Sequence, residues 1–349
     1  MKTTRLVSAL AASLGLGLAL APSLSPAQDK KPTELRYTSG APPTGNPWVM
    51  QTNRFAKNVE EESKNELKIQ PFFGSQLGSE QDTVQQVARG RIDMGGFSTG
   101  SAALVVPEIT LLTMPGYFRD VQEQDCVLDN HMVKVTTELF EKKGVRFLGW
   151  TEVGAVELFG KKAFVAPKDM NGVKAAAYAN KTQTVFYGSL GATAIPLGLP
   201  EWIPAFQTGM AEAVLTVITY ALPSGLTKVA PVVTRNGLSN APGITLMNKA
   251  VFDKLPKAQQ EALTKASERV PSSQYRAEIR GFESTLYGMM EKAGGQVAVL
   301  TPEQREVWRK TLEPNQPRQG RGRSGRWRQS LFRRHGSGPQ GLHQITASA

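Results

Sequence analysis

The residues best suited to chemistry are polar and aromatic side chains placed where predicted strands end, and they suit binding. In open α/β sheets small molecules bind at the carboxyl ends of strands, where the connecting loops converge. Hydroxyl groups there can hydrogen-bond a ligand, and aromatic rings can pack against it. The positions selected in this way are Ser39, Gly40, Trp48, Ser98, Thr99, Trp150, Thr151, Tyr178, Asn180, Trp202 and Thr216. We expect them to line a cleft for a small molecule.

Residue sets that would carry catalysis or hold a metal are not evident. Cys126 is the one cysteine and His131 the one histidine of the chain body, so no Cys/His zinc site can be assembled. There is no glycine-rich phosphate loop and no Cys/His pair with a third orienting group. The acidic run 60–62 lies on a charged helical pattern, where solvation is the usual explanation. We predict that the protein is not an enzyme and needs no cofactor.

The elements that must position these residues alternate along the chain, which indicates βαβ units and parallel sheets. Strands are predicted at 35–39, 67–73, 92–97, 145–150, 156–160, 173–178 and 213–218, and a turn at 167–172. Helices are predicted to begin after Asn46 and Ser79, to cover 121–142, and to pass through Val185 and Leu190. From 251 to about 292 the pattern is helical and is interrupted at Pro256 and Pro271.

The first 27 residues have the pattern of a secretory signal peptide. Lys2 and Arg5 precede an apolar run from 6 to 20, and small residues follow at 25–27. A transmembrane anchor is the alternative, but a span needs about 20 apolar residues. We expect cleavage near residue 27, export to the periplasm, and a mature chain without membrane spans.

Net charge is concentrated at the two ends of the chain. Of 41 basic residues, two lie in the first 27 residues and seven are arginines between 318 and 334, which leaves 32 against 30 acidic residues. A nearly neutral body predicts no nucleic-acid partner.

Residues 315–349 contain no acid and are rich in Arg, Gly, Ser and Gln, which predicts a disordered basic tail. An RNA-binding arm is an alternative, and a frameshift that replaced a native C-terminal helix explains the abrupt change best.

Several spaced blocks resemble one protein family. They include PFFGSQLGSEQDTVQQVARGRIDM at 71–94, MPGYFRD at 114–120, PKDMNGVK at 167–174, LGATAIPL at 190–197 and EWIPAFQTGMAEAV at 201–214. Together they resemble the substrate-binding component of tripartite ATP-independent periplasmic (TRAP) transporters, the dicarboxylate-receptor-like (DctP) family. The resemblance covers about 34–312 in the expected order.

The resemblance implies an α/β fold with two lobes, of the Venus-flytrap kind found in periplasmic binding proteins, and a helix-rich C-terminal part. It places lobe I at 28–153 with about 243–281 returning to it, lobe II at 154–242, and a C-terminal helical segment at 282–314. It implies a monomer that captures a small organic solute and delivers it to TRAP membrane subunits. A receptor of an ATP-driven importer or of a sensor kinase is the alternative.

Three positions depart from the family pattern. Ala176 stands where most relatives carry the arginine that binds the ligand carboxylate, Val156 where a second basic residue is often found, and Thr216 in place of an asparagine. Losing one partner of a buried charge pair costs about 2 to 5 kcal/mol. Either the solute lacks a carboxylate, or other groups bind that carboxylate. Those groups are backbone amides at a helix start, Lys174 or Lys181.

Overall fold

The strands form one mixed sheet in which a single long strand serves two halves. The computed structural model describes residues 31–44, 46–178 and 181–312, and the elements below belong to one compact unit that begins at Pro32. The strand order is β2-β1-β3-β9-β4-β7-β5-β6; β8 pairs with β4, and β10 with β8. The strands are β1 Thr33–Ser39, β2 Leu67–Phe72, β3 Met94–Ser98, β4 Val145–Gly160, β5 Lys174–Ala177, β6 Thr193–Pro196, β7 Ala213–Val217, β8 Val232–Arg235, β9 Asn240–Asn248 and β10 Gln296–Val299.

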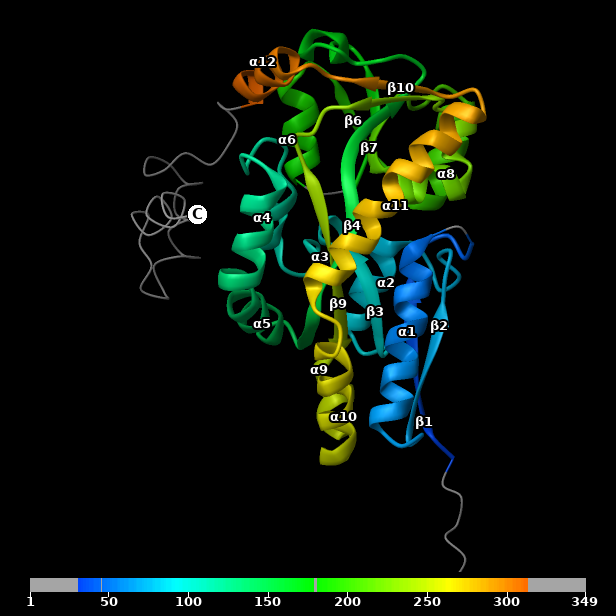
Figure 1. Ribbon diagram of the computed structural model, residues 1–349, viewed down its shortest axis with the longest axis vertical. Helices are drawn as coiled ribbons and strands as arrows, with labels where there is room; N and C mark the ends of the chain where they lie inside the picture. Colours follow the sequence, from blue (N-terminus) through cyan, green and yellow to red (C-terminus); the bar gives the residue numbers. More distant parts are fainter. Residues whose placement is uncertain (1–30, 45, 179–180, 313–349) are drawn as a thin grey trace, which may run out of the picture. The chain divides into compact units, whose positions relative to one another are not determined.

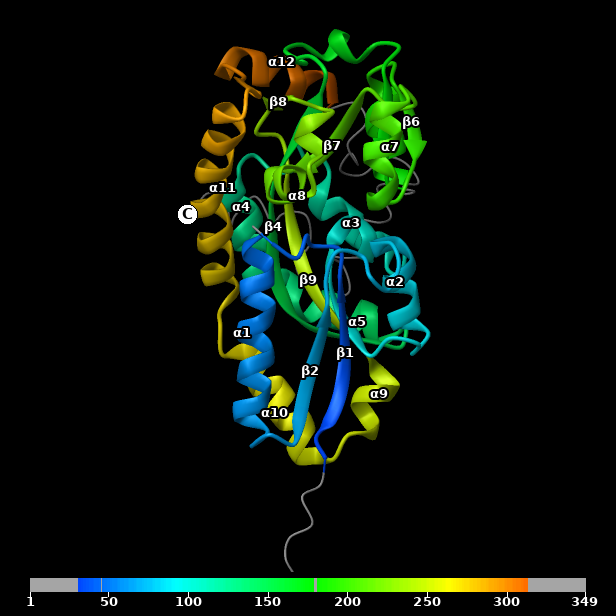
Figure 2. The ribbon, with the colours of Figure 1, turned by 90° about the vertical axis from the view of Figure 1, so that its right-hand side faces the viewer.

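The first half-sheet is β2-β1-β3-β9 with the first part of β4. Here β1 pairs in parallel with β2 and β3, and β9 lies antiparallel between β3 and β4. Alternate side chains face opposite layers: Ile244 and Leu246 enter one core cluster and Met247 the other. Figure 2 shows β9 beside β4. The second half-sheet contains the end of β4 with β5, β6, β7, β8 and β10.

Helices cover both half-sheets, and their starts follow local signals. Asn46 caps α1, with Pro47 in its first turn, and the Ser79 side chain accepts the amide of Asp82 at the start of α2. The longest helix, α11, contacts β4, α1 and α8 (Figure 1). The α-helices are α1 Pro47–Glu62, α2 Glu80–Ala88, α3 Thr99–Ala102, α4 Val121–Val127, α5 Val133–Glu141, α6 Lys181–Ser189, α7 Trp202–Gln207, α8 Ile218–Ser224, α9 Lys249–Lys254, α10 Lys257–Glu268, α11 Ser272–Lys292 and α12 Pro302–Leu312.

Short helical turns complete the described part. The 3₁₀ turns are η1 Pro107–Thr113, η3 Pro167–Met170, η4 Leu199–Glu201 and η5 Leu226–Lys228, and η2 Leu128–Met132 is a π-helical turn. The predicted helix over 121–142 is therefore divided by η2 into α4 and α5. No helix of the described residues is long and apolar enough to cross a bilayer. The predicted signal peptide at 1–27 and the tail at 315–349 lie outside the described residues.

Three sequence predictions need correction. The strands expected at 145–150 and 156–160 are one strand, β4, because the intervening residues continue the ladder through a register shift between Glu152 and Gly154. The central strand β9 was not expected, because Pro242 and Gly243 lower the strand propensity of its sequence. The segment 282–314 is not helical throughout, since β10 separates α11 from α12.

Buried carboxyl groups cluster where β4 passes from the first half-sheet to the second. Ala155 pairs with β9 and Val156 with β7. Glu283 of α11 accepts the amide hydrogen bond of Ala155 at 2.7 Å. Arg280 of α11 binds Glu152 at 3.3 Å and Asp125 of α4 at 2.7 Å.

Desolvation raises the pKa of three carboxyl groups at this crossing: Glu283, Glu152 and the next glutamate of β4, Glu157. Burial raises the pKa of Glu152 to about 7, although the charge of Arg280 opposes the shift. Burial also raises the pKa of Glu157 to about 8, against the lowering effect of the amide of Asn236 and the charge of Arg235. Glu152 and Glu157 therefore hold protons at pH values where a carboxyl in water is ionised.

This predicts a protein that loses stability as pH rises. Glu157 has a pKa near 8 in the folded chain against 4.5 for an ordinary glutamate, so between these values the folded state binds the extra proton. Its stabilising effect is present at low pH and is lost as pH rises through 8, with a slope of at most about 1.4 kcal/mol per pH unit. Urea unfolding at pH 6 and pH 9 measures this change in the free energy of unfolding. Glu157→Gln should flatten the slope relative to the exposed-site control Glu268→Gln; equal slopes in both variants would contradict the prediction.

Candidate ligand-binding site

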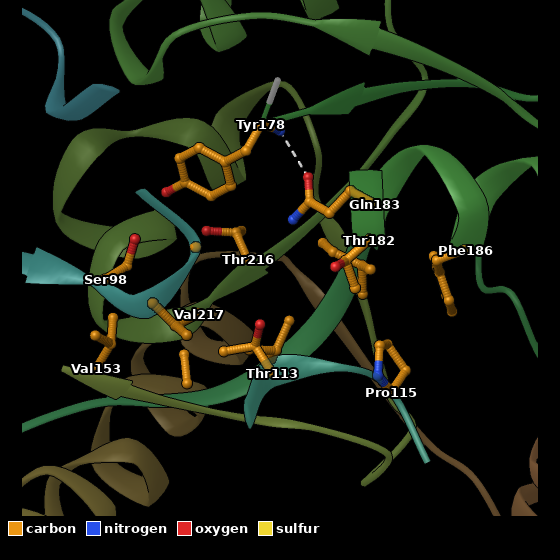
Figure 3. A pocket seen from close by; sticks show the side chains of 14 residues that line it. Ser98, Thr113, Pro115, Val153, Tyr178, Thr182, Gln183, Phe186, Thr216 and Val217 are labelled. Carbon is orange, nitrogen blue, oxygen red and sulfur yellow. Dashed lines mark hydrogen bonds between the residues drawn. The ribbon is translucent and has the colours of Figure 1, made fainter. Parts of the chain in front are cut away.

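A cavity of about 70 Å³ lies where loops and strands of both half-sheets converge. That volume holds roughly five to seven water-sized groups, so it suits a compact molecule. Figure 3 shows Ser98 on one side, Tyr178 with Gln183 on another, and Thr216 between them. The lining residues are Ser98, Gly100, Thr113, Pro115, Val153, Val156, Tyr178, Thr182, Gln183, Phe186, Leu215, Thr216, Val217 and Ala241.

The cavity wall combines hydroxyl groups with apolar surface. Hydroxyls come from Ser98, Thr113, Tyr178, Thr182 and Thr216. The apolar part is formed mainly by Val153 and Val156 of β4, Val217 of β7 and the aromatic ring of Phe186 in α6. None of the described lining residues carries a charged side chain. Such a wall can hydrogen-bond a hydroxylated molecule and pack against its carbon skeleton.

A buried glutamate lies directly behind this wall. Glu80, in the first turn of α2, is 6% exposed. Its carboxylate accepts hydrogen bonds from the Ser98 amide at 2.5 Å, from the Ser101 hydroxyl at 2.8 Å and from the Tyr178 hydroxyl at 3.3 Å. Burial raises the pKa of Glu80, and these donors oppose the shift. Because α2 covers the first half-sheet and Tyr178 follows β5, the Tyr178 bond joins the two halves across the cavity.

Tyr178 is held in place from three directions. Its amide donates to Gln183 Oε1 at 2.6 Å (Figure 3). Its ring packs edge to face on Trp202, with ring centroids 5.6 Å apart. Desolvation raises the pKa of Tyr178 well above its ordinary value, so its hydroxyl keeps its proton and donates it to Glu80. Toward the cavity the hydroxyl oxygen can therefore accept a hydrogen bond, and a fixed acceptor can select for ligand orientation.

Three of the predicted site residues line this cavity and three line another. Ser98, Tyr178 and Thr216 are at the cavity described above. Trp48, Trp150 and Thr151 line a separate cavity of about 30 Å³ on the first half-sheet.

The other predicted site residues lie away from both cavities. Ser39 caps the amide of Ala41, Thr99 donates to the carbonyl of Pro242, and Gly40 lies against Leu199. Trp202 and Ala176 are fully buried in one core cluster. Asn180 lies outside the described residues.

The positions that depart from the family pattern have different surroundings. Val156 and Thr216 line the cavity, whereas the Ala176 side chain packs in the core beside Trp202. Lys174 is exposed and does not line the cavity. Glu201, the first residue of the block EWIPAFQTGMAEAV, is exposed and accepts the amide of Gly198 at 2.7 Å.

Sequence reasoning overlooked several features of the site. Thr113 follows no predicted strand, and Thr182 and Gln183 lie beyond the end of the predicted strand 173–178, in the first turn of α6. The sequence prediction has a helix begin after Ser79 and gives Glu80 no role in the site, although an acid that begins a helix beside a predicted strand end is a signal for such a role.

A further overlooked feature is the run Gly96–Gly100, which has the Gly-x-Ser-x-Gly spacing of a hydrolase nucleophile elbow. In the structure the Ser98 hydroxyl is bonded to Glu80 and to the hydroxyl and amide of Ser101. These contacts orient Ser98 as part of the wall and place no histidine beside it.

Comparisons with known proteins identify the family of the chain. The model of the family "Bacterial extracellular solute-binding protein, family 7" (DctP) matches residues 38–319. The chain belongs to this family. A solute-binding protein of Verminephrobacter eiseniae is 31% identical over 214 residues, which are 61% of this chain and 64% of that relative, so the match spans just under two thirds of its length.

Solved structures of family 7 type confirm the two-lobed α/β fold. A TRAP periplasmic solute-binding protein of Polaromonas, with bound D-erythronate, is 25% identical with a TM-score of 0.75, and the match covers 81% of this chain and 92% of that chain. Another TRAP periplasmic solute-binding protein, from Sulfurospirillum deleyianum with bound succinate, is 21% identical with a TM-score of 0.79. The match covers 86% of this chain and 99% of that chain.

The contact between Tyr178 and Glu80 predicts a selective loss of solute affinity. Tyr178→Phe keeps the ring on Trp202 but removes the hydroxyl that joins the two halves. One hydrogen bond contributes about 0.5 to 1.5 kcal/mol, so the solute dissociation constant should rise about 2- to 10-fold. Calorimetry with the cognate solute measures it. Tyr117→Phe, outside the cavity, is the matched control, and an unchanged affinity in Tyr178→Phe would refute the role of the hydroxyl.

Proposed function

We propose that this chain is an extracytoplasmic receptor that captures a small organic acid and delivers it to a TRAP-type secondary transporter. The observation that carries the proposal is the cavity lined from both half-sheets, in a chain of solute-binding family 7. A cavity with walls on two lobes couples capture of a solute to lobe closure. The proposal includes export through the signal peptide at 1–27, action as a monomer, and binding without chemical conversion.

The relatives and the cavity wall together favour a compact hydroxylated acid. The similar solved proteins hold D-erythronate and succinate. In this chain Ser98 and Tyr178, both bonded to Glu80, present hydroxyl groups that suit the hydroxyl end of such a solute. The Glu80 carboxyl accepts hydrogen bonds from Ser98 and Tyr178 and supplies no positive charge to a second carboxylate, so the acid group is proposed to face away from it.

The opposite end of the cavity is the start of α6. Thr182 and Gln183, in the first turn of this nine-residue helix, line the cavity. Amide groups and the helix dipole favour negative charge at a helix start. We therefore place the carboxylate there, in a chain whose β5 carries Ala176 in place of a guanidinium. Lys174 is excluded as the counter-charge by its position away from the cavity.

A ligand screen tests this function. At 100 times its dissociation constant a solute adds about 2.7 kcal/mol, which should raise the melting temperature by about 5 to 11 °C. We expect aldonic and other short hydroxy acids to give this shift, and their amides or alcohols to give at least tenfold weaker binding in calorimetry. Stabilisation by the neutral analogues alone would reject the acid. The absence of any stabilising small molecule would reject the receptor.

The transporter partner needs its own measurement. Uptake of the identified solute into proteoliposomes that contain a TRAP membrane pair should require this protein and an ion gradient, but no ATP. Uptake that depends on ATP and an ATPase subunit would assign the receptor to the other importer class.

A further inference from the structure

A second cavity, on the first half-sheet, shares no lining residue with the solute cavity. It has a volume of about 30 Å³ and lies between β1, α1, β4, β9 and the start of α11. Its lining residues are Tyr37, Trp48, Gln51, Thr52, Phe55, Leu148, Gly149, Trp150, Thr151, Thr245, Ser267 and Tyr275. It includes the stretch of β4 where the register shifts between Phe147 and Gly149.

Four buried polar atoms of residues that line this cavity have no hydrogen-bond partner among the described residues. They are Gln51 Oε1, Thr52 Oγ1, Trp150 Nε1 and Thr151 Oγ1. Their residues are 3%, 3%, 2% and 9% exposed. Each buried group left without a partner costs about 1 to 3 kcal/mol, so a ligand that satisfies these atoms would stabilise the fold substantially.

The orientation of the Gln51 amide is fixed by its other atom. Gln51 Nε2 donates to the carbonyl of Tyr275 at 3.2 Å and to the carboxylate of Glu278 at 3.0 Å. Turning the amide over would set its oxygen against two acceptors. Gln51 Oε1 is therefore an acceptor, whereas Trp150 Nε1 can only donate and the Thr151 hydroxyl can do both.

This combination of groups defines the chemistry of the occupant. A bare cation would meet the N–H group of Trp150, and an anion would meet the oxygen of Gln51. A volume of about 30 Å³ equals two or three water-sized groups. A neutral molecule that both donates and accepts can satisfy all four atoms.

We propose that this cavity is a binding site for two or three ordered water molecules that join α1 to β4. Water donates to Gln51 Oε1, accepts from Trp150 Nε1 and exchanges either bond with Thr151. The site lies at the register shift of β4, so the waters replace contacts that the irregular strand does not make itself. It also gives Trp150 and Thr151 a role apart from the solute cavity, where strand-end position had placed them.

Water ¹⁷O magnetic relaxation dispersion, which counts long-lived internal waters, tests the proposal. The double variant Trp150→Phe/Thr151→Val should lose two or three such waters relative to the wild type, and the control Thr137→Val on α5 should lose none. Solute affinity should stay within twofold in both, since the cavities share no residue. An unchanged count, or a large loss of solute affinity, would overturn the proposal.

A crystal structure of the unsubstituted protein provides an independent test that requires no variant to fold. Ordered density within hydrogen-bonding distance of Gln51 Oε1 and Trp150 Nε1, refining as water, is the expected result. A dry cavity, or density that refines as a metal ion or an organic molecule, would overturn the assignment.

Discussion

The fold depends on how one strand changes partners. At the crossing of β4, the ladder to β9 ends at Ala155 and the ladder to β7 begins at Val156. Gly154 adopts φ +128°, and a Cβ there would lie 2.4 Å from Glu283 Oε1. Glycine therefore permits α11 to pack close to β4. Glu283 of α11 accepts a hydrogen bond from the amide of Ala155, at the point where β4 changes its pairing partner.

The same crossing is held by charges that are distant in sequence. Arg280 of α11 binds Asp125 of α4 and Glu152 of β4. Arg276, one turn earlier and 3% exposed, binds Asp125 and Asp129. Removing one partner of a buried pair leaves an uncompensated charge, at a cost of about 3 to 5 kcal/mol. The relation of α11 to the two half-sheets is thus specified by paired charges in addition to apolar packing.

Elements with complete local signals were predictable, and those fixed by distant partners were not. The capping side chains of Asn46 and Ser79 predict the starts of α1 and α2. The strand β9 contains proline and glycine and is stabilised by pairing with β3 and β4. No local sequence pattern predicts this pairing. In the site, the strand-end rule found Ser98, Tyr178 and Thr216. The rule missed Glu80 for two reasons. An acidic residue in the first turn of a helix is already explained by its favourable interaction with the helix dipole, and its hydrogen-bond partner Tyr178 lies 98 residues away in sequence.

The packing around β5 bears on how the proposed acid could be recognised. Ala176 is fully buried in the core cluster that contains Trp202 and Phe206, whereas Ala175 and Ala177 belong to the cluster on the opposite face of β5. A guanidinium in that core would have to displace a tryptophan ring or be buried without a counter-charge, and either costs several kcal/mol. The ring of Trp202 also supports Tyr178. Trp202, which shares a core cluster with Ala176, thus helps to position the hydroxyl that bridges the cavity, and the proposed function places charge recognition at the start of α6.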